Sequence, residues 1–240
     1  MLKINNLTKS YGDKKAVDNL SLHIEPGQIY AFIGHNGAGK TTTIKCAIGL
    51  LDFDSGEVFI DGVSIKEKPI ECKKKLAYIP DSPDLYEYMS GIKFLNFVAD
   101  IYGVSKAERE EKIKKYADMF EITDDLAQPI SQYSHGMKQK LALISALIHS
   151  PKLIILDEPF VGLDPKASFL LKEEMKMLCK EGVSIFFSTH VLDVAEKLCD
   201  SIAIIKNGKL IASGKMQDVK GDESLESVFL DLYETKGENN

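Results

Sequence analysis

Residues 34–41 read Gly-His-Asn-Gly-Ala-Gly-Lys-Thr, between an apolar stretch at residues 28–33 and a stretch able to form a helix at residues 42–48. This pattern is typical of a complete phosphate-binding loop. Glycines in such a loop let backbone N–H groups converge on phosphate oxygens, and the helix that follows points the positive end of its dipole toward them. Lys40 is expected to reach the β- and γ-phosphates, and the Thr41 hydroxyl to bind Mg²⁺. A glycine-rich turn without a ligand is the alternative, but the order of strand, loop and helix favours a site. The residues predicted to bind a nucleoside triphosphate are Gly34, Asn36, Gly37, Ala38, Gly39, Lys40, Thr41 and Thr42.

Two adjacent acids, Asp157 and Glu158, directly follow the apolar run at residues 153–156. Because open parallel sheets bind ligands beyond the carboxyl ends of their strands, both acids are expected beside the triphosphate. Asp157 would hold Mg²⁺, usually through water, and Glu158 would accept a proton from the water that attacks the γ-phosphate. A solvated strand end is the alternative, but two acids after such an apolar run would be costly without a cation.

A histidine, His190, follows the next apolar strand, at residues 183–187. A histidine at this position can hydrogen-bond the γ-phosphate and hold the attacking water and Glu158 in register. A lone histidine there is more often a polar strand end, so it is the acidic pair upstream that favours a catalytic role. The predicted catalytic residues are therefore Glu158, His190 and Lys40.

The segments around these motifs alternate between apolar strands and helices, and this order predicts an α/β protein. A helix is expected at residues 166–180 between strands at 153–156 and 183–187, as in a parallel sheet. Short strands separated by turns precede the phosphate loop, and apolar residues at helical spacing predict a mainly helical insertion at about residues 82–150. An apolar stripe near the end predicts one more short helix, followed by a frayed tail at residues 236–240. The stripe consists of Leu225, Val228, Phe229 and Leu232.

Composition narrows the class of protein further. With 240 residues, of which 44% are hydrophobic, the chain fits one α/β domain with at most a modest insertion. The net charge of -6 provides no general attraction for nucleic acid, and Arg109 is the only arginine. The four cysteines have no paired spacing, which argues against a zinc site or a disulfide framework. We find no signal peptide and no apolar run long enough to span a bilayer, so any membrane association is expected to occur through a partner.

Between the insertion and the acidic strand lies the run Tyr133-Ser134-His135-Gly136-Met137-Lys138-Gln139-Lys140. With this run, the sequence resembles the ATP-binding subunit of an ATP-binding-cassette (ABC) transporter over nearly its full length. Residues 134–137 stand at the family's signature, usually Leu-Ser-Gly-Gly-Gln, and residues 162–164 stand at its D-loop. The resemblance assigns His190 as the family's switch histidine and Tyr11 as the aromatic residue that stacks on adenine.

The signature region also predicts a second anion site. A helix is expected at residues 136–149, with Ser134 as the capping residue at its N-terminal border. The N–H groups and dipole of this helix would bind an anion that the chain's own phosphate loop does not hold. In the family, two subunits pair head to tail, so that Ser134 and Gly136 of one copy would contact the ATP bound at Lys40 of the other. Asp164 would cross the same interface.

Three residues depart from the family pattern. Asp81 stands where the family usually has a glutamine that touches Mg²⁺, and it would join Thr41 and Asp157 as a metal ligand. Because like charges repel without a cation between them, we expect Asp81 to make nucleotide closure more dependent on Mg²⁺. In the signature, His135 replaces a glycine and Met137 replaces a glutamine. His135 is expected to act as a spacer, with pH sensing as the alternative.

The resemblance implies a P-loop NTPase core with a mainly parallel sheet, an N-terminal antiparallel β subdomain and an α-helical insertion. The expected division is a nucleotide-binding domain at residues 1–222, with its helical subdomain at about 82–150, and a short helix and tail at 223–240. The implied function is ATP hydrolysis, with ATP and Mg²⁺ bound, that powers an ABC transporter from the cytoplasmic face of the membrane. A second copy or a paralogous ATPase would complete the pair, and residues 84–89 would offer a partly apolar groove to a transmembrane permease.

The altered residue at position 81 and the sequence of residues 225–230 are similar to those of the export-type (ABC-2-like) branch, so export is the expected direction. A soluble ABC ATPase that acts on the ribosome or on DNA is the main alternative. It is disfavoured because the chain has neither fused cassettes nor coiled coils nor zinc modules, and because it nearly lacks arginine. A nucleotide switch without turnover is disfavoured because Glu158 is intact.

Overall fold

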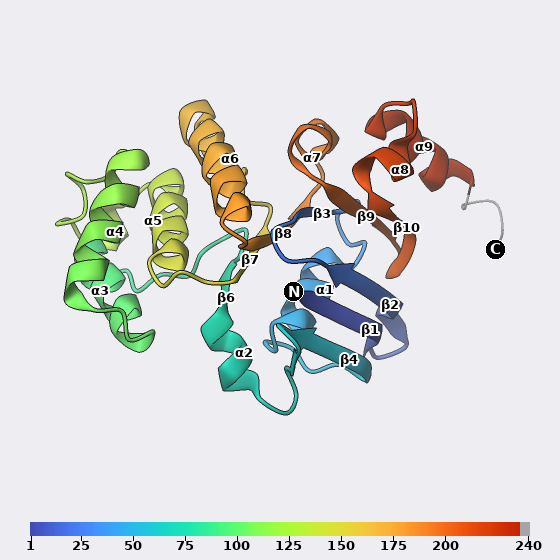
Figure 1. Ribbon diagram of the computed structural model, residues 1–240, viewed down its shortest axis with the longest axis horizontal. Coiled ribbons are helices and arrows are strands. Elements are labelled where there is room, and N and C mark those ends of the chain that lie inside the picture. Colours follow the sequence, from blue (N-terminus) through green and yellow to red (C-terminus); the bar gives the residue numbers. More distant parts are fainter. Residues whose placement is uncertain (236–240) are drawn as a thin grey trace.

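Two β-sheets organise residues 1–235, the part of the chain that the computed structural model describes (Figure 1). The first sheet is antiparallel, with strands in the order β2 (Lys14–Ile24), β1 (Leu2–Tyr11), β4 (Ser55–Ile60) and β5 (Val63–Ser64). The second has the order β10 (Lys209–Lys215), β9 (Ser201–Lys206), β3 (Ile29–Ile33), β8 (Ser184–Thr189), β7 (Leu153–Asp157) and β6 (Leu76–Ile79). Only the β10–β9 pair of this sheet is antiparallel. The predicted α/β class, with an antiparallel N-terminal sheet and a mainly parallel second sheet, is confirmed.

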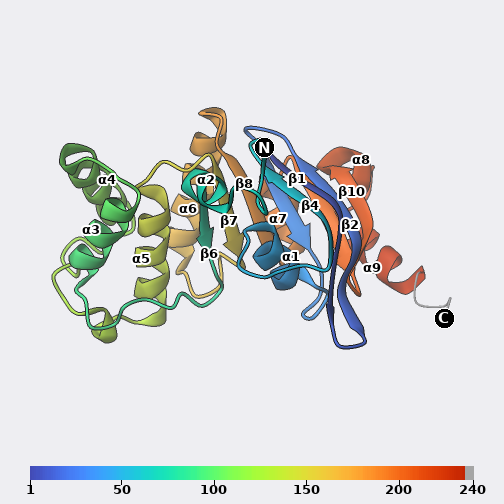
Figure 2. The same ribbon diagram turned by 90° about the horizontal axis from the view of Figure 1, so that it is seen from below.

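Nine helices surround the sheets within the described residues, together with a short 3-10 turn at Ile130–Gln132. They are α1 (Lys40–Ala47), α2 (Pro69–Lys75), α3 (Gly91–Ile101), α4 (Lys106–Met119), α5 (His135–Leu147), α6 (Pro165–Lys180), α7 (Leu192–Leu198), α8 (Met216–Lys220) and α9 (Leu225–Thr235). In Figures 1 and 2, α3, α4 and α5 gather at one end of the molecule, and α8 and α9 lie at the opposite end. None of these helices combines the length and apolar character needed to span a bilayer.

Strand β3 lies between two hydrophobic cores. All five of its residues are buried, and alternate side chains point to opposite faces of the sheet. Ile29, Ala31 and Ile33 pack in a core that they share with the helices from α3 to α9. Tyr30 and Phe32 pack in a second core with the N-terminal sheet and α1. The strand that leads into the phosphate loop is therefore fixed from both sides.

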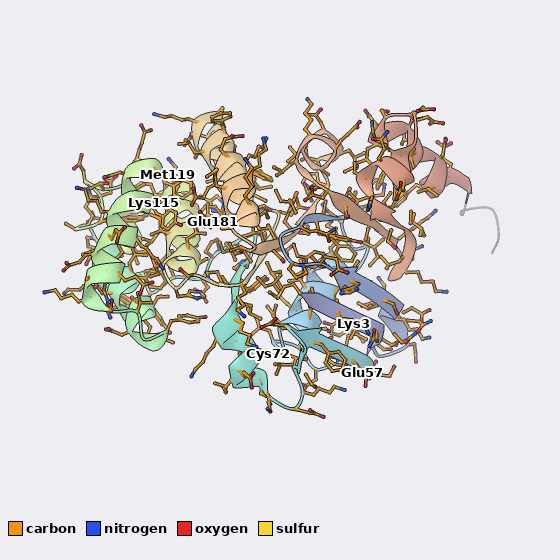
Figure 3. The ribbon with its side chains drawn as sticks, in the orientation of Figure 1. Lys3, Glu57, Cys72, Lys115, Met119 and Glu181 are labelled. Carbon is orange, nitrogen blue, oxygen red and sulfur yellow. The ribbon has the colours of Figure 1, made fainter. Side chains whose placement is uncertain are left out.

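Polar contacts join the helical insertion to α6 and hold its own helices together. Lys115 on α4, labelled in Figure 3, forms an ion pair of 2.9 Å with the mostly buried Glu174 on α6. The only arginine, Arg109, pairs with Asp100 and donates to the carbonyl oxygen of Val104, so its guanidinium holds α4 against the end of α3. His149, two residues beyond the end of α5, is half-buried, and this burial lowers its pKa to about 4.

The sequence located most elements but not the shortest ones. The predicted signature helix and the last helix are present as α5 and α9, with ends that differ from the predicted ones by at most a few residues. Helices α2, α7 and α8 and strand β5 were not expected; the longest of them has seven residues. Such short segments hardly display a period. The predicted tail at residues 236–240 lies outside the described residues, and the domain boundary at residue 222 stays a prediction.

Candidate nucleotide site

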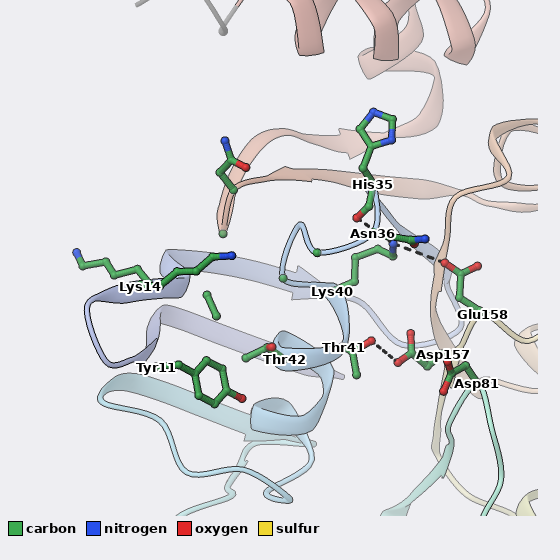
Figure 4. Close-up of a pocket in the computed structure, with 16 residues that line it drawn as sticks. Tyr11, Lys14, His35, Asn36, Lys40, Thr41, Thr42, Asp81, Asp157 and Glu158 are labelled. Carbon is green, nitrogen blue, oxygen red and sulfur yellow. Dashed lines mark hydrogen bonds and ion pairs between the residues drawn. The ribbon is translucent and has the colours of Figure 1, made fainter. Parts of the chain in front are cut away.

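A pocket of about 590 Å³ surrounds the loop that joins β3 to α1, at the carboxyl ends of β3 and β7 (Figure 4). This volume lies in the range typical of small-molecule sites. It is lined by Tyr11, Lys14, Lys15, Ala16, His35, Asn36, Gly37, Gly39, Lys40, Thr41, Thr42, Asp81, Asp157, Glu158, Asn207 and Gly208. Of the predicted loop residues, Gly34 and Ala38 are buried within the loop and do not line the pocket.

Two glycines give the loop its shape. Gly39 has φ of 111°, and a Cβ there would lie 2.4 Å from the carbonyl oxygen of Ala16. A Cβ at Gly34 would lie 2.6 Å from the carbonyl oxygen of Ile205. Both distances are shorter than real Cβ contacts allow, so a side chain at either position would push the loop away from the strands that support it. The loop follows this path because it packs directly on the backbone of β2 and β9.

Lys40 is held against the backbone of the loop. Its ammonium group donates hydrogen bonds to the carbonyl oxygens of Gly34, at 2.6 Å, and His35, at 3.4 Å. The residue is only 6% exposed, and α1 begins at Lys40 itself. A compact positive charge and a helix N-terminus therefore meet in the pocket, as an anionic phosphate requires.

All three oxygen-bearing side chains predicted to hold a metal, those of Thr41, Asp81 and Asp157, line the same pocket. The Thr41 hydroxyl donates a hydrogen bond of 2.7 Å to Asp157 Oδ2, and the Ser188 hydroxyl donates to Asp157 Oδ1. Asp81 lines the pocket as well, and its carboxylate accepts a hydrogen bond from the N–H of Ser82. Two carboxylates and a hydroxyl are the hard oxygen donors that Mg²⁺ prefers, so the residues fit this cation. Ser188 was not predicted; its position on β8 beside β7 is a consequence of the sheet order.

Glu158 lies between two groups that control its orientation. Its Oε1 is 3.6 Å from Lys40 Nζ, and its Oε2 is 3.0 Å from Nδ1 of His190. The backbone of Glu158 has φ of 49°, the left-handed region that non-glycine residues rarely adopt, and its N–H donates to the carbonyl and hydroxyl oxygens of Ser188. Strained backbone of this kind clusters at functional sites. The structure thus brings together the three residues predicted to be catalytic.

The signature residues lie outside this pocket. Ser134 caps α5, because its hydroxyl accepts a hydrogen bond of 3.3 Å from the N–H of Met137. His135 packs on the D-loop of the same chain: a Cβ at Gly162 would lie 2.5 Å from His135 Cδ2. At Gly136, a Cβ would lie 2.9 Å from the Gly162 carbonyl oxygen. His135 and Gly136 therefore set how closely the signature and the D-loop approach each other within one chain.

Asp164 is also engaged within its own chain. Its carboxylate accepts a hydrogen bond of 2.8 Å from the N–H of Ala167, at the start of α6, and it lies 2.9 Å from Lys140 Nζ. These two contacts, the N–H of Ala167 first, lower the pKa of Asp164. Its predicted role across an interface stays a prediction.

Tyr11 lines the pocket at its open side and is 54% exposed, as a residue that stacks on a bound base must be. Lys14 and Lys15 at the start of β2, and Asn207 and Gly208 in the turn between β9 and β10, line the pocket beside it. These four were not predicted from the sequence, and neither were Ala16 and His35. For Lys14 and Lys15, the available signal was a pair of adjacent lysines that begins three residues after the aromatic Tyr11. For Asn207 and Gly208 the sequence contains no signal, since only the fold brings them to the pocket.

Comparisons with known proteins agree with this arrangement. The sequence model of a family described as "ABC transporter" matches residues 17–161. A lantibiotic transport ATP-binding protein of Streptococcus pyogenes is 37% identical over 229 residues, which cover 95% of this chain and 96% of that protein. A solved ATP-binding subunit of an ABC transporter superposes with a TM-score of 0.94 at 35% identity, covering 97% of this chain and 99% of the other. A bacterial ABC transporter cassette solved as a dimer gives a TM-score of 0.82 at 25% identity, covering 90% of this chain and 99% of the other.

The match to the family extends from strand β2 through the phosphate loop to the acidic end of β7. The full-length relative and the solved subunit extend the similarity to nearly the whole chain. This protein therefore belongs to the ABC transporter family, as a subunit that binds and hydrolyses ATP to power the transporter.

Proposed function

We propose that this subunit drives export through a membrane permease, using two ATP molecules held between two copies, or one copy and a paralogous ATPase, paired head to tail. The proposed catalytic mechanism is supported by the position of Glu158. Its carboxylate lies at the edge of the phosphate pocket, close to both Lys40 and His190. A carboxylate held there can align a water molecule with the γ-phosphate and accept its proton.

The residues of the site have separate roles in binding and hydrolysing ATP. Lys40 and the N-terminus of α1 stabilise the negative charge that develops on the phosphate oxygens. His190 holds the carboxylate of Glu158 so that one of its oxygens stays directed toward the attacking water. Thr41, Asp81 and Asp157 would hold Mg²⁺, which neutralises phosphate charge when it is bound. Tyr11 would stack on the base.

The head-to-tail arrangement is supported by the position of Ser134. The capped N-terminus of α5 offers unpaired N–H groups, yet Ser134 and Gly136 do not line the pocket of their own chain. A partner's nucleotide is the anion that this site would take. The dimeric cassette among the solved structures is consistent with such a pair.

The permease would bind the helical subdomain beside the start of α3, where the large apolar side chains of Tyr86, Tyr88, Phe97 and Ile101 are between 40% and 102% exposed. Tyr86 packs on Phe97, with ring centroids 5.7 Å apart, and Phe97 and Ile101 lie one turn apart on α3. Large exposed apolar side chains that gather in this way mark an interaction site. The surface begins five residues after Asp81, so a partner bound there could influence the nucleotide site.

Replacing Tyr88 with aspartate is expected to reduce co-purification of the permease about tenfold or more, because a charge would enter an apolar interface. The isolated subunit should keep its ATPase rate, since Tyr88 does not line the pocket and its side chain is fully exposed. The measurement is affinity purification from detergent-solubilised membranes, with the bound proteins identified by mass spectrometry. Ile70→Asp is the matched control, because Ile70 is equally apolar and 66% exposed but lies on α2. Equal permease recovery for the Tyr88 variant would refute this docking surface, and recovery of ribosomes instead would favour the soluble alternative.

Asp81→Gln is expected to raise the Mg²⁺ concentration at half-maximal ATPase activity by about threefold to tenfold. The negative charge that makes closure depend on Mg²⁺ also attracts the cation, so removing it weakens Mg²⁺ binding and makes closure without the cation less unfavourable. The glutamine restores the residue usual in the family. The measurement is the ATPase rate at fixed ATP while Mg²⁺ is titrated. Asp81→Asn, which removes the charge at constant side-chain length, should shift the midpoint in the same direction. An unchanged midpoint in both variants would discard the proposed coupling between Asp81 and Mg²⁺.

The export direction rests on relatives and not on the site itself. The 37% identical S. pyogenes relative is named as a lantibiotic transport protein, and a peptide, lipid or drug-like compound is the cargo class we propose. The net charge of -6 and the single arginine, which is already bound to Asp100, disfavour nucleic acid as a substrate.

A further inference from the structure

The C-terminal helix α9 contacts the phosphate loop through an aromatic cluster that the hydrolysis steps do not use. The His35 ring lies edge-on to two rings of α9, with centroids 4.4 Å from Tyr233 and 5.2 Å from Phe229. The rings of Tyr233 and Phe229 are themselves 4.3 Å apart. In Figure 4 the His35 ring points away from Lys40, so α9 reaches the loop on the side opposite to the catalytic lysine.

Tyr233 also binds the backbone on which the loop rests. Its hydroxyl oxygen accepts a hydrogen bond of 3.3 Å from the His35 N–H and donates one of 2.6 Å to the carbonyl oxygen of Ile205. The same Ile205 oxygen is the atom that a Cβ at Gly34 would strike. Lys206 Nζ donates to the carbonyl oxygen of Tyr233 and lies 5.2 Å above its ring. One side chain thus joins the second residue of the loop to the end of β9.

The other end of α9 is anchored on α7. Leu225 is fully buried, and its N–H donates a hydrogen bond of 3.0 Å to Glu196 Oε2. Glu196 Oε1 accepts a second bond, of 2.9 Å, from Lys220. Helix α7 begins two residues after His190. The single helix α9 therefore contacts both the segment that follows His190 and the loop that precedes Lys40.

We propose that Tyr233 and Phe229 are positioning residues for nucleotide binding, which hold the phosphate loop, through His35, in the conformation that receives the phosphates. The Lys40 ammonium is bound to the carbonyl oxygens of Gly34 and His35, so a displacement at His35 moves the groups that place the lysine. A loop without this support must be ordered at the moment of binding, which lowers affinity. The bound nucleotide itself orders the loop and Lys40, and Glu158 bonds to Lys40, His190 and Ser188, so we expect the loss in nucleotide affinity and not in the chemical step. The inference rests on the ATP site of the proposed function, but not on the permease or on the direction of transport.

Tyr233→Ala is expected to weaken binding of MgADP by about threefold to tenfold, the range that loss of an aromatic pair implies. Calorimetric titration with MgADP measures this without turnover. In steady-state assays KM for ATP should rise by a similar factor, while kcat stays within about twofold. His35→Ala should weaken binding to the same extent, and the double variant should be no weaker than either single one. Leu230→Ala is the control, because Leu230 lies on α9 and is 51% exposed.

An affinity of Tyr233→Ala equal to that of the wild type would overturn the inference, and so would fully additive effects of the His35 and Tyr233 changes. If circular dichroism shows that Tyr233→Ala does not fold, Tyr233→Phe decides. It keeps the ring and removes both hydroxyl hydrogen bonds, so about twofold weaker MgADP binding supports the inference and unchanged binding overturns it. A wild-type protein that binds no MgADP would instead count against the nucleotide site itself, which separates the two failures.

Discussion

Glutamine in place of Glu158 is expected to lower the steady-state ATPase rate at least about 100-fold, because the general base is lost. The amide keeps the size of the side chain and its place between Lys40 and His190, so ATP should still bind. A nucleotide that binds without being cleaved should hold two copies together. The measurements are phosphate release at saturating MgATP and the size of the complex by gel filtration with and without ATP.

Glu181→Gln is the matched control for this substitution, because Glu181 is an exposed acid beyond the end of α6, and it should leave both measurements unchanged. Full phosphate release by the Glu158 variant would mean that another group activates the water. Loss of ATP binding together with activity would mean that Glu158 holds the site together and would leave its role as a base without support.

Mixing two inactive variants is expected to restore ATPase activity if each reaction centre is shared between two copies. Lys40→Ala removes the phosphate lysine, and Ser134→Glu places a charge at the capped start of α5, so each variant alone should lose at least about 90% of its rate. In a mixed dimer, one centre carries both defects and the other carries none. Half of the dimers in an equal mixture are mixed and each has one intact centre of two, so about a quarter of the wild-type rate should return.

The control for the mixing experiment uses two defects on the same side of a centre. Lys40→Ala mixed with Glu158→Gln leaves no intact centre in any dimer, so the rate should remain at the level of the separate variants. Recovery in this control would point to exchange or repair unrelated to the pairing. If mixed dimers of Lys40→Ala and Ser134→Glu are shown to be present but recover no ATPase activity, a head-to-tail centre that works independently of the other centre is refuted.

Much of the site could be predicted because many of its residues belong to short, contiguous sequence motifs. The glycine spacing before Lys40 and the two acids after an apolar strand each specify a local structure, and sheet topology then places both at one edge. The contact of Glu158 with Lys40 and His190 follows from strand order, since β3, β8 and β7 are neighbours. The burial of β3 on both faces of the sheet could likewise be expected, because its residues form one continuous apolar run.

The remaining features depend on contacts between distant segments, which no local pattern encodes. His35 and Tyr233 are 198 positions apart, and only the path of the chain after β10 brings α9 to the loop. The packing of His135 on Gly162 depends on how α5 meets the D-loop. Ser188 could be recognised as a partner of Asp157 only when the register of β7 and β8 was known. Side-chain roles of this kind require the three-dimensional arrangement.

The position of β3 between two hydrophobic cores has a consequence for how the protein unfolds. The five residues of β3 pack in both hydrophobic cores, so disrupting one core removes packing from a strand that the other core also needs. Unfolding of the antiparallel sheet would expose Tyr30 and Phe32 and would also loosen Ala31 and Ile33, which pack in the other core. We therefore expect the unfolding of the two cores to be coupled through β3.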